Sequence, residues 1–107
     1  MTRVGFVLKV KPALIESYVE RHREVWPEML EALRAASWHN YSLFLAPDGT
    51  LFGYFETPTS LAAAQEAMQR SAVNARWQSE MAPFFELPQG AAPDTAMVVL
   101  REIFHLD

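Results

Sequence analysis

The stretch HNYSLFLAPDGTLFGYFE, residues 39–56, carries the strongest signal for the fold. Apolar and polar side chains alternate over residues 39–45, which is the period-two pattern of a β-strand, and the chain returns as a second strand over residues 50–56. Between them, Pro47-Asp48-Gly49 combines a proline that fixes φ with a glycine that accepts a positive φ, as tight turns require. The sequence therefore predicts an antiparallel hairpin made of these two strands.

The segment before the hairpin predicts a strand and then a helix. Residues 3–10 alternate in the same way as the hairpin strands. Residues 14–36 instead carry apolar side chains at every third or fourth position, which places them on one face of a helix. Pro27 interrupts this helix, and it either kinks the helix or begins a second one.

The segment after the hairpin repeats the order of helix and strand. The expected elements are a helix capped by Thr59 or Ser60 and ending at Met68 or Arg70, a helix capped by Ser71 or Asn74 and ending near Phe85, a loop over residues 87–94, and a strand over residues 96–106. The whole order predicts one α+β domain over residues 1–107 with ferredoxin-like βαββαβ topology. Its four-stranded antiparallel sheet would carry the helices on one face.

The strand over residues 50–56 is apolar on both sides. Leu51 and Phe55 point to one face, and Phe52 and Tyr54 point to the other. A sheet face in contact with water alternates more cleanly, so we expect the second face to be covered. A second copy of the chain is the simplest cover, which predicts a homodimer through the open sheet face. The alternative is that the loop over residues 87–95 folds across this face.

Composition limits the classes of protein to which the chain can belong. Its 107 residues suffice for one domain, and the 50% hydrophobic and 21% charged residues are ordinary for a folded protein. Nine basic and 13 acidic residues give a net charge of −4, which argues against a nucleic acid or an anionic membrane as partner. Without cysteine, disulfides and thiolate nucleophiles are excluded. The N-terminal apolar stretch is too short for a signal peptide, so we expect a cytoplasmic protein.

Tyr18 and His22 lie four residues apart on the apolar face of the predicted helix. A phenol and an imidazole that face a sheet must find partners or line a cavity, since an unpaired buried polar group costs about 1–3 kcal/mol. Histidine also exchanges protons near neutral pH. The spacing is compatible both with a catalytic histidine and with an interior histidine bonded to a backbone carbonyl.

Two aromatic residues elsewhere can join this pair. Tyr41 approaches His22 if its face of the sheet meets the helix, and Trp77 stands between the polar residues Arg76 and Gln78. An aromatic ring against the C–H face of a sugar, with hydroxyl, amide or imidazole groups at its edge, suits an uncharged polyol. The alternative is that Tyr41 and Trp77 only pack in the core and bind no ligand.

Motifs for other chemistry are weak or missing. The three histidines, His22, His39 and His105, have no metal-ligand spacing, and the four glycines form no phosphate-binding loop. The Gly-x-Ser-x-Gly pattern of a hydrolase is also missing. The residues therefore predict neither a metal nor a cofactor.

The chain resembles the L-rhamnose mutarotase family over nearly its whole length. The motifs that carry the resemblance are Tyr18-Val-Glu-Arg-His22-Arg-Glu-Val-Trp26-Pro27-Glu28, His39-Asn40-Tyr41, Leu51-Phe52-Gly53, Arg76-Trp77 and Glu102-Ile-Phe104-His-Leu106. The Tyr-x3-His-x3-Trp-Pro-Glu run is the most specific of them.

This resemblance implies a cytoplasmic, cofactor-free enzyme that interconverts the α and β anomers of L-rhamnose or a closely related 6-deoxy sugar. It also implies a homodimer of ferredoxin-like subunits, of the dimeric α/β-barrel type. By position, His22 would be the proton donor, and Tyr18, Tyr41, Trp77 and Gln78 would bind the sugar. The family often has two adjacent tryptophans at the last site, whereas here Trp77 is followed by Gln78.

The chemistry implied is acid–base opening of the pyranose ring, with the base at the anomeric hydroxyl left open between water and a second tautomer of His22. Two other functions compete. Cofactor-independent monooxygenases that act on flat aromatic substrates share the same small dimeric architecture. A non-catalytic module that binds a small ligand, with His22 in a structural role, is the third candidate.

Overall fold

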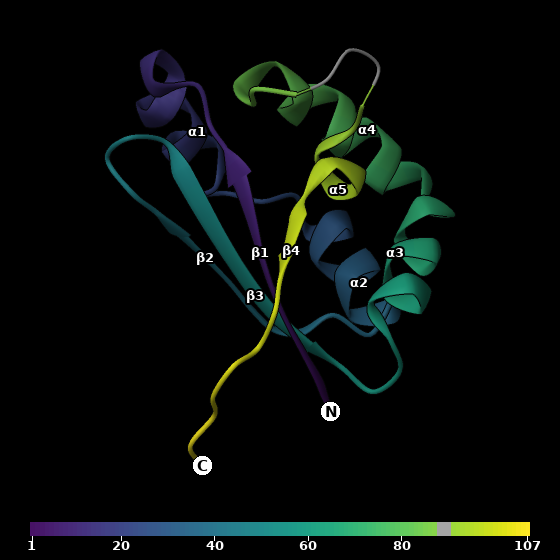
Figure 1. The fold of residues 1–107 in the computed structure, drawn as a ribbon. Coiled ribbons are helices and arrows are strands. Elements are labelled where there is room, and N and C mark those ends of the chain that lie inside the picture. Colours follow the sequence, from purple (N-terminus) through teal and green to yellow (C-terminus); the bar gives the residue numbers. More distant parts are fainter. Residues whose placement is uncertain (88–90) are drawn as a thin grey trace.

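A four-stranded antiparallel sheet forms one layer of the molecule, as Figure 1 shows. The structure is a computed structural model that describes residues 1–87 and 91–107. Its strands are β1 (Thr2–Lys9), β2 (His39–Leu45), β3 (Thr50–Thr57) and β4 (Val98–Leu100), in the spatial order β2-β3-β1-β4. Each neighbouring pair is antiparallel. The predicted ferredoxin-like α+β fold is confirmed.

The turn between β2 and β3 forms where the sequence predicts it. Gly49 has a φ of +95°, and a Cβ atom there would lie 2.2 Å from the carbonyl oxygen of Val10. Only glycine fits both the positive φ and this close approach. The side chain of Asp48 accepts a hydrogen bond from the Thr50 N–H at 2.9 Å, which is the short-range bond that favours aspartate in turns.

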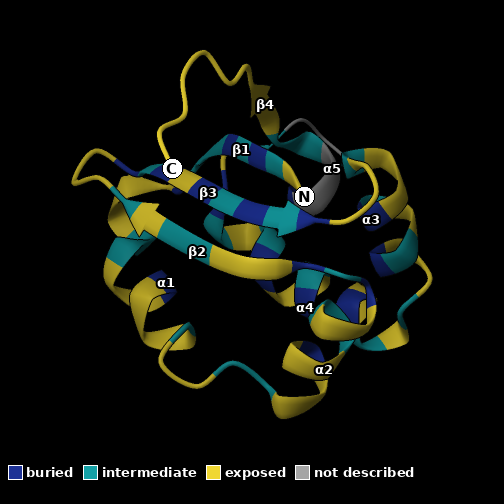
Figure 2. Ribbon diagram, turned by 90° about the horizontal axis from the view of Figure 1, so that it is seen from below, coloured by how far each residue is buried: buried dark blue, intermediate teal, exposed yellow. Residues whose placement is uncertain are grey.

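The helices cover one face of this sheet (Figure 2). They are the 3₁₀ turn η1 (Pro12–Leu14), α1 (Ile15–Arg21), α2 (Pro27–Ala35), α3 (Leu61–Gln69), α4 (Ala72–Met81), the 3₁₀ turn η2 (Ala82–Phe84) and α5 (Pro93–Ala96). The side-chain oxygens of Ser60 and Ser71 cap α3 and α4. Within the described residues, these helices are too short or too polar to cross a bilayer.

Pro27 begins a second helix, which answers the question that the sequence left open. It is the first residue of α2, where a missing N–H has no consequence. Trp26 before it is extended, with a ψ of 133°, because the proline ring disfavours the helical conformation of its predecessor. Residues 22–24 form a turn between the two helices.

The predicted strand over residues 96–106 is largely wrong. Pairing with β1 is confined to Val98–Leu100, residues 93–96 form α5, and residues 101–107 have no regular structure. Valine, isoleucine and phenylalanine in this segment favour strands, but a strand exists only where a neighbour accepts its hydrogen bonds. The tail is held to β1 by an ion pair between Arg3 Nε and Glu102 Oε1 at 2.8 Å. Residues 88–90 of the predicted loop lie outside the described residues.

The core lies between the sheet and the helices. Phe6, Val10, Leu51 and Phe55 are almost fully buried there. Gly53 leaves room for Phe6 across the β1–β3 pair, since a Cβ atom at Gly53 would lie 2.1 Å from the phenyl ring. The inward half of the alternation in β3 therefore faces the helices as predicted.

The other face of the sheet is open and apolar. Phe44 is 63% exposed and Phe52 38% exposed, and their rings lie 6.4 Å apart. Val98 and Leu100 of β4 are also exposed, opposite Val7 and Gly5 of β1. The described part of the loop over residues 87–95 does not lie across this face, because Pro93 lines a cavity on the helix-covered side.

Candidate active site

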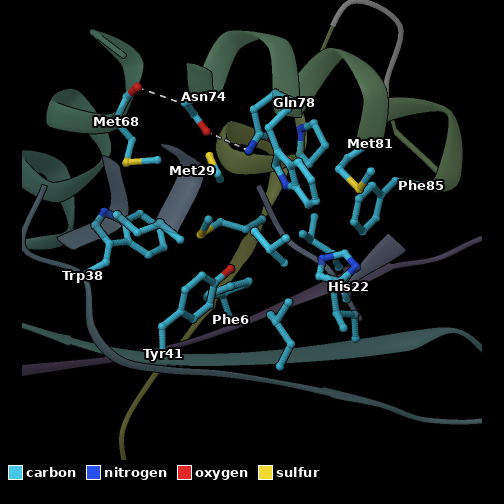
Figure 3. Close-up of a pocket in the computed structure, with 18 of the residues that line it drawn as sticks. Phe6, His22, Met29, Trp38, Tyr41, Met68, Asn74, Gln78, Met81 and Phe85 are labelled. Atoms are coloured by element: carbon cyan, nitrogen blue, oxygen red, sulfur yellow. Dashed lines mark hydrogen bonds between the residues drawn. The ribbon is translucent and has the colours of Figure 1, made fainter. Parts of the chain in front are cut away.

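A cavity of about 270 Å³ lies between the sheet and the helices. This volume is close to the lower end of the range for small-molecule sites, about 300–1,000 Å³. All five side chains that the sequence singled out line it: Tyr18, His22, Tyr41, Trp77 and Gln78. Figure 3 shows His22, Tyr41 and Gln78 reaching toward the same space from different elements.

Tyr18 and His22 are held together by the geometry of α1. They are four residues apart, one turn of the helix, and their ring centroids lie 4.3 Å apart at a tilt of 39°. Tyr18 is 5% exposed and is packed on its other sides by the edges of Phe84 and Phe85. His22 is the C-cap residue of α1, immediately after Arg21, where the turn toward Pro27 begins.

The hydrogen bond that His22 makes with the backbone fixes its tautomer. Its Nδ1 lies 2.9 Å from the carbonyl oxygen of Tyr18. A carbonyl oxygen only accepts, so Nδ1 carries the proton, and Nε2 of the neutral ring is an acceptor. Burial lowers the pKa of His22 below its ordinary value, and the bond to the Tyr18 carbonyl opposes this shift in part. At neutral pH the ring is therefore mainly neutral, with an unprotonated Nε2.

The phenol of Tyr18 stays protonated. Burial raises its pKa far above the ordinary value, and the nearby phenol of Tyr41 raises it further. Tyr18 therefore offers the cavity an O–H donor at every physiological pH. Tyr41 lines the same cavity.

Tyr41 reaches the cavity from an irregular point of β2. The pairing of β2 with β3 shifts register between His39 and Ser42, and Asn40 has a φ of +48°. Such a bulge redirects side chains, and asparagine tolerates the left-handed conformation better than most residues. The Tyr41 ring packs at 5.3 Å from Trp38, which itself stacks on Phe55 at 3.8 Å.

Trp77 of α4 forms the opposite wall. It is 7% exposed, and its ring meets the edges of His22 at 5.6 Å and Trp26 at 5.0 Å. The guanidinium of Arg76 lies over the Trp26 ring, outside the cavity. The imidazole that offers Nε2 is thus placed between the aromatic rings of Tyr18 and Trp77.

Comparison with known proteins supports the fold and the family resemblance. A family model described as L-rhamnose mutarotase matches residues 3–106. The chain belongs to the L-rhamnose mutarotase family. Among its relatives, the L-rhamnose mutarotases of Oceanobacillus iheyensis, Bacillus subtilis and Opitutus terrae are 34%, 35% and 37% identical, each over 100% of both chains.

A solved member of the mutarotase family has the same fold. The crystal structure of an L-rhamnose mutarotase from Formosa agariphila matches with a TM-score of 0.79 and 24% identity, and the match covers 100% of both chains. At this identity the match supports the fold alone.

Sequence reasoning missed part of the cavity wall. Asn74 lines the cavity and is 3% exposed, although the sequence suggested only a helix cap for it. Four methionines line the cavity as well: Met29, Met68, Met81 and Met97. They come from separate elements, so no spacing along the chain could have grouped them. His39 and His105 are not among the lining residues, and within the described chain no three acidic or histidine side chains gather closely enough to hold a metal.

Proposed function

We propose that this protein interconverts the α and β anomers of L-rhamnose, or of a closely related 6-deoxy sugar, by acid–base opening of the pyranose ring. The observation that supports this most directly is the placement of Tyr18, His22, Tyr41, Trp77 and Gln78 around one cavity. Membership of the L-rhamnose mutarotase family points to the same reaction.

His22 exchanges the proton on which the reaction depends. In ring opening, the anomeric hydroxyl loses a proton, C1 becomes a carbonyl, the bond from C1 to the ring oxygen breaks, and that oxygen gains a proton. The unprotonated Nε2 of His22 accepts the proton of the anomeric hydroxyl. The imidazolium then passes this proton to the ring oxygen as its bond to C1 breaks. After rotation about the C1–C2 bond, Nε2 takes the proton back from that hydroxyl and acts as the proton donor to the carbonyl oxygen as the ring closes. His22 thus serves as base and then as acid, and returns to its neutral form.

The surrounding groups hold the sugar in place for this exchange. The Tyr18 and Tyr41 phenols offer hydrogen bonds to sugar hydroxyls, and the Trp77 ring offers a flat apolar surface to the C–H face of the sugar. The four cavity methionines supply a soft apolar wall that suits the methyl group of a 6-deoxy sugar. A hydroxymethyl group at the same place would lose hydrogen bonds to water, so common hexoses should be poorer substrates.

Exchange NMR of L-rhamnose tests the proposal. Purified protein at catalytic concentration should produce exchange cross-peaks between the α and β anomeric protons, well above the uncatalysed rate. L-mannose serves as the matched sugar, because it differs from L-rhamnose only by a hydroxymethyl group in place of the methyl group. Binding shifts without faster exchange would contradict the enzymatic role, and oxygen uptake with an aromatic substrate and no effect on the sugar would favour a monooxygenase instead.

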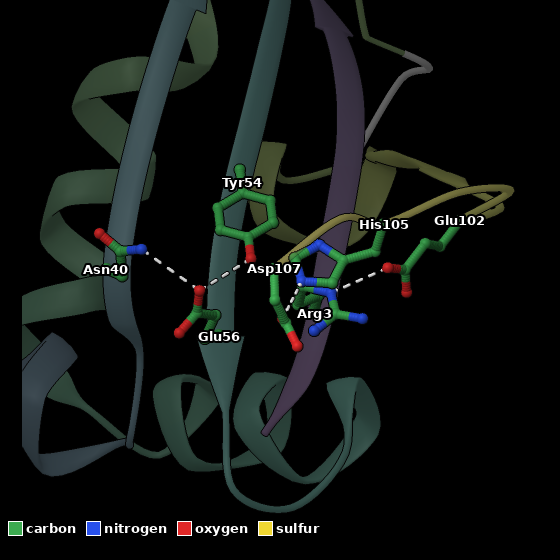
Figure 4. A network of polar contacts seen from close by, with 7 residues as sticks. All are labelled: Arg3, Asn40, Tyr54, Glu56, Glu102, His105 and Asp107. Atoms are coloured by element: carbon green, nitrogen blue, oxygen red, sulfur yellow. Dashed lines mark hydrogen bonds and ion pairs between the residues drawn. The ribbon is translucent and has the colours of Figure 1, made fainter.

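We further propose that the protein is a homodimer joined through the open sheet face. The exposed Phe44 and Phe52 rings and the exposed β4 residues form one apolar patch there. A polar network borders the patch, as polar rims border interfaces. Figure 4 shows its parts: the ion pair of Arg3 with Glu102, and Glu56, which accepts hydrogen bonds from Asn40 and Tyr54 at 3.2 and 2.8 Å.

The cellular setting is part of the same proposal. Family membership and the net charge of −4 support a cytoplasmic enzyme whose partners are a sugar and a second copy of itself, with no nucleic acid or membrane. Cell fractionation measures this directly. Recovery of the protein in the membrane or secreted fraction would contradict it.

A further inference from the structure

A chain of two side-chain amides runs from the end of α3 to the cavity wall. Asn74 Nδ2 donates a hydrogen bond to the carbonyl oxygen of Met68 at 3.1 Å. Gln78 Nε2 in turn donates to Asn74 Oδ1, also at 3.1 Å. Figure 3 shows both bonds, with Gln78 at the end that reaches the cavity. Asn74 and Gln78 are four residues apart on α4, so helical geometry alone brings them together.

The first bond decides the orientation of both amides. The Met68 carbonyl only accepts, so Asn74 must present its NH₂ group there and its oxygen toward Gln78. The Asn74 oxygen can only accept, so Gln78 must donate to it through its NH₂ group. The nitrogen and oxygen of an amide point in different directions from the same carbon. The Gln78 oxygen is therefore directed away from Asn74.

Asn74 is well suited to hold this arrangement. It is 3% exposed, and its backbone N–H donates to the Ser71 hydroxyl oxygen at 3.3 Å. Both its backbone and its side chain are thus tied to the corner between α3 and α4. Reversal of the Asn74 amide would set two oxygens against each other in a buried place, which costs more than a lost hydrogen bond.

We propose that Asn74 is a positioning residue that fixes Gln78, so that the Gln78 amide oxygen accepts a hydrogen bond from one hydroxyl of the sugar. This inference rests on the proposed function and makes it more specific. At this wall of the cavity, an amide oxygen would recognise a sugar hydroxyl by a hydrogen bond, where an aromatic ring would offer only an apolar surface. Asn74 itself acts only through Gln78.

A double-mutant cycle tests the inference. Gln78→Met keeps the length of the side chain and removes its hydrogen bonds, and Asn74→Leu removes the support. Each single variant should raise KM for L-rhamnose about 3- to 10-fold, the worth of one neutral hydrogen bond, with little change in kcat. In the Gln78→Met background, Asn74→Leu should have no further effect on KM. A merely structural Asn74 would raise KM equally in both backgrounds, and that result would overturn the inference.

Substrate analogues supply the second measurement. Deoxy derivatives of L-rhamnose, each lacking one ring hydroxyl, should include one whose removal weakens binding to the wild type but not to Gln78→Met. If every derivative loses affinity equally for the wild type and for Gln78→Met, the Gln78 amide does not accept a hydrogen bond from a sugar hydroxyl. Asn74→Ala replaces Asn74→Leu in the cycle if the larger side chain prevents folding.

The two proposals fail in different ways. A wild-type protein that accelerates anomer exchange while the cycle is additive contradicts the role of Asn74 alone. A wild-type protein that binds L-rhamnose without accelerating exchange contradicts the mutarotase function. In that case the double-mutant cycle compares dissociation constants for L-rhamnose instead of KM values. A protein that neither binds the sugar nor accelerates its exchange overturns both.

Discussion

The imidazole of His22 packs on the ring of Tyr18 at 4.3 Å and donates its Nδ1 proton to the backbone carbonyl of that same residue. A single residue one turn earlier thus sets the position of the ring and also its tautomer. The sequence offered a catalytic histidine and a histidine bonded to a backbone carbonyl as alternatives. In this structure the two coincide, because the bond that satisfies Nδ1 is also the one that leaves Nε2 as an acceptor.

The pH profile should report the neutral form of His22. Burial lowers its pKa below the ordinary value of 6.5, so the unprotonated Nε2 persists to lower pH than in a free histidine. We expect kcat/KM to be constant through neutral pH and to fall only below pH 6.5. An activity that rises as the pH drops through this range would contradict a neutral resting histidine. Initial rates of anomer exchange from pH 4.5 to 8 provide the measurement.

Tyr18→Phe tests the phenol separately from the ring that supports His22. The aromatic packing at 4.3 Å and the backbone bond to His22 remain, while the O–H donor is lost. We expect KM to rise about 3- to 10-fold with a smaller change in kcat. Tyr54→Phe is the matched control, because its hydroxyl bonds to Glu56 outside the cavity. Equal kinetics for the two variants would exclude Tyr18 from sugar binding.

Phe44→Glu tests the homodimer. Two symmetric copies of this ring would be buried in the interface, and each would contribute about 1.5–3 kcal/mol of apolar burial. The variant should therefore be monomeric at concentrations where the wild type is dimeric, as measured by sedimentation velocity. Val19→Glu is the control, because it places the same charge on an exposed apolar position of α1. A wild type that sediments as a monomer would contradict the proposal.

Gly53→Ala tests the packing of the sheet. The new methyl group would lie 2.1 Å from the Phe6 ring, so the core must shift, and we expect a loss of about 1–3 kcal/mol in the free energy of unfolding. At Gly5, an added Cβ would meet Phe52 at an ordinary 3.6 Å, and Gly5→Ala should change stability by less than about 0.5 kcal/mol. Urea denaturation compares the two. Equal losses would mean that the contact with Phe6 is not what requires glycine.

Most of the fold could be predicted because local chemistry agrees with the final pairing. Pro47-Asp48-Gly49 makes a turn through its own bonds, and Ser60 and Ser71 cap helices through neighbouring N–H groups. The C-terminal segment was mispredicted for the opposite reason. Residues 101–106 belong to the predicted strand, but a strand depends on a partner distant in the sequence, and pairing with β1 ends at Leu100.

The candidate site also has one part that local sequence predicts and one part that depends on tertiary packing. Tyr18 and His22 could be paired from the sequence, since four residues along a helix always make neighbours. Their meeting with Trp77 and Gln78 depends on how α1 packs against α4, which no local pattern encodes, and there the family resemblance supplied what the spacing could not. Asn74 was missed because its role lies in two bonds made after folding, to Met68 and Gln78.

Replacement of His22 is the most direct test of the central claim. His22→Asn should lower the rate of L-rhamnose anomer exchange about 10²- to 10⁴-fold, the usual contribution of a general acid–base residue, while the thermal unfolding profile stays cooperative. His39→Asn is the matched control, because this exposed histidine does not line the cavity, and its exchange rate should equal that of the wild type. A folded His22→Asn protein that exchanges the anomers at the wild-type rate would contradict the account.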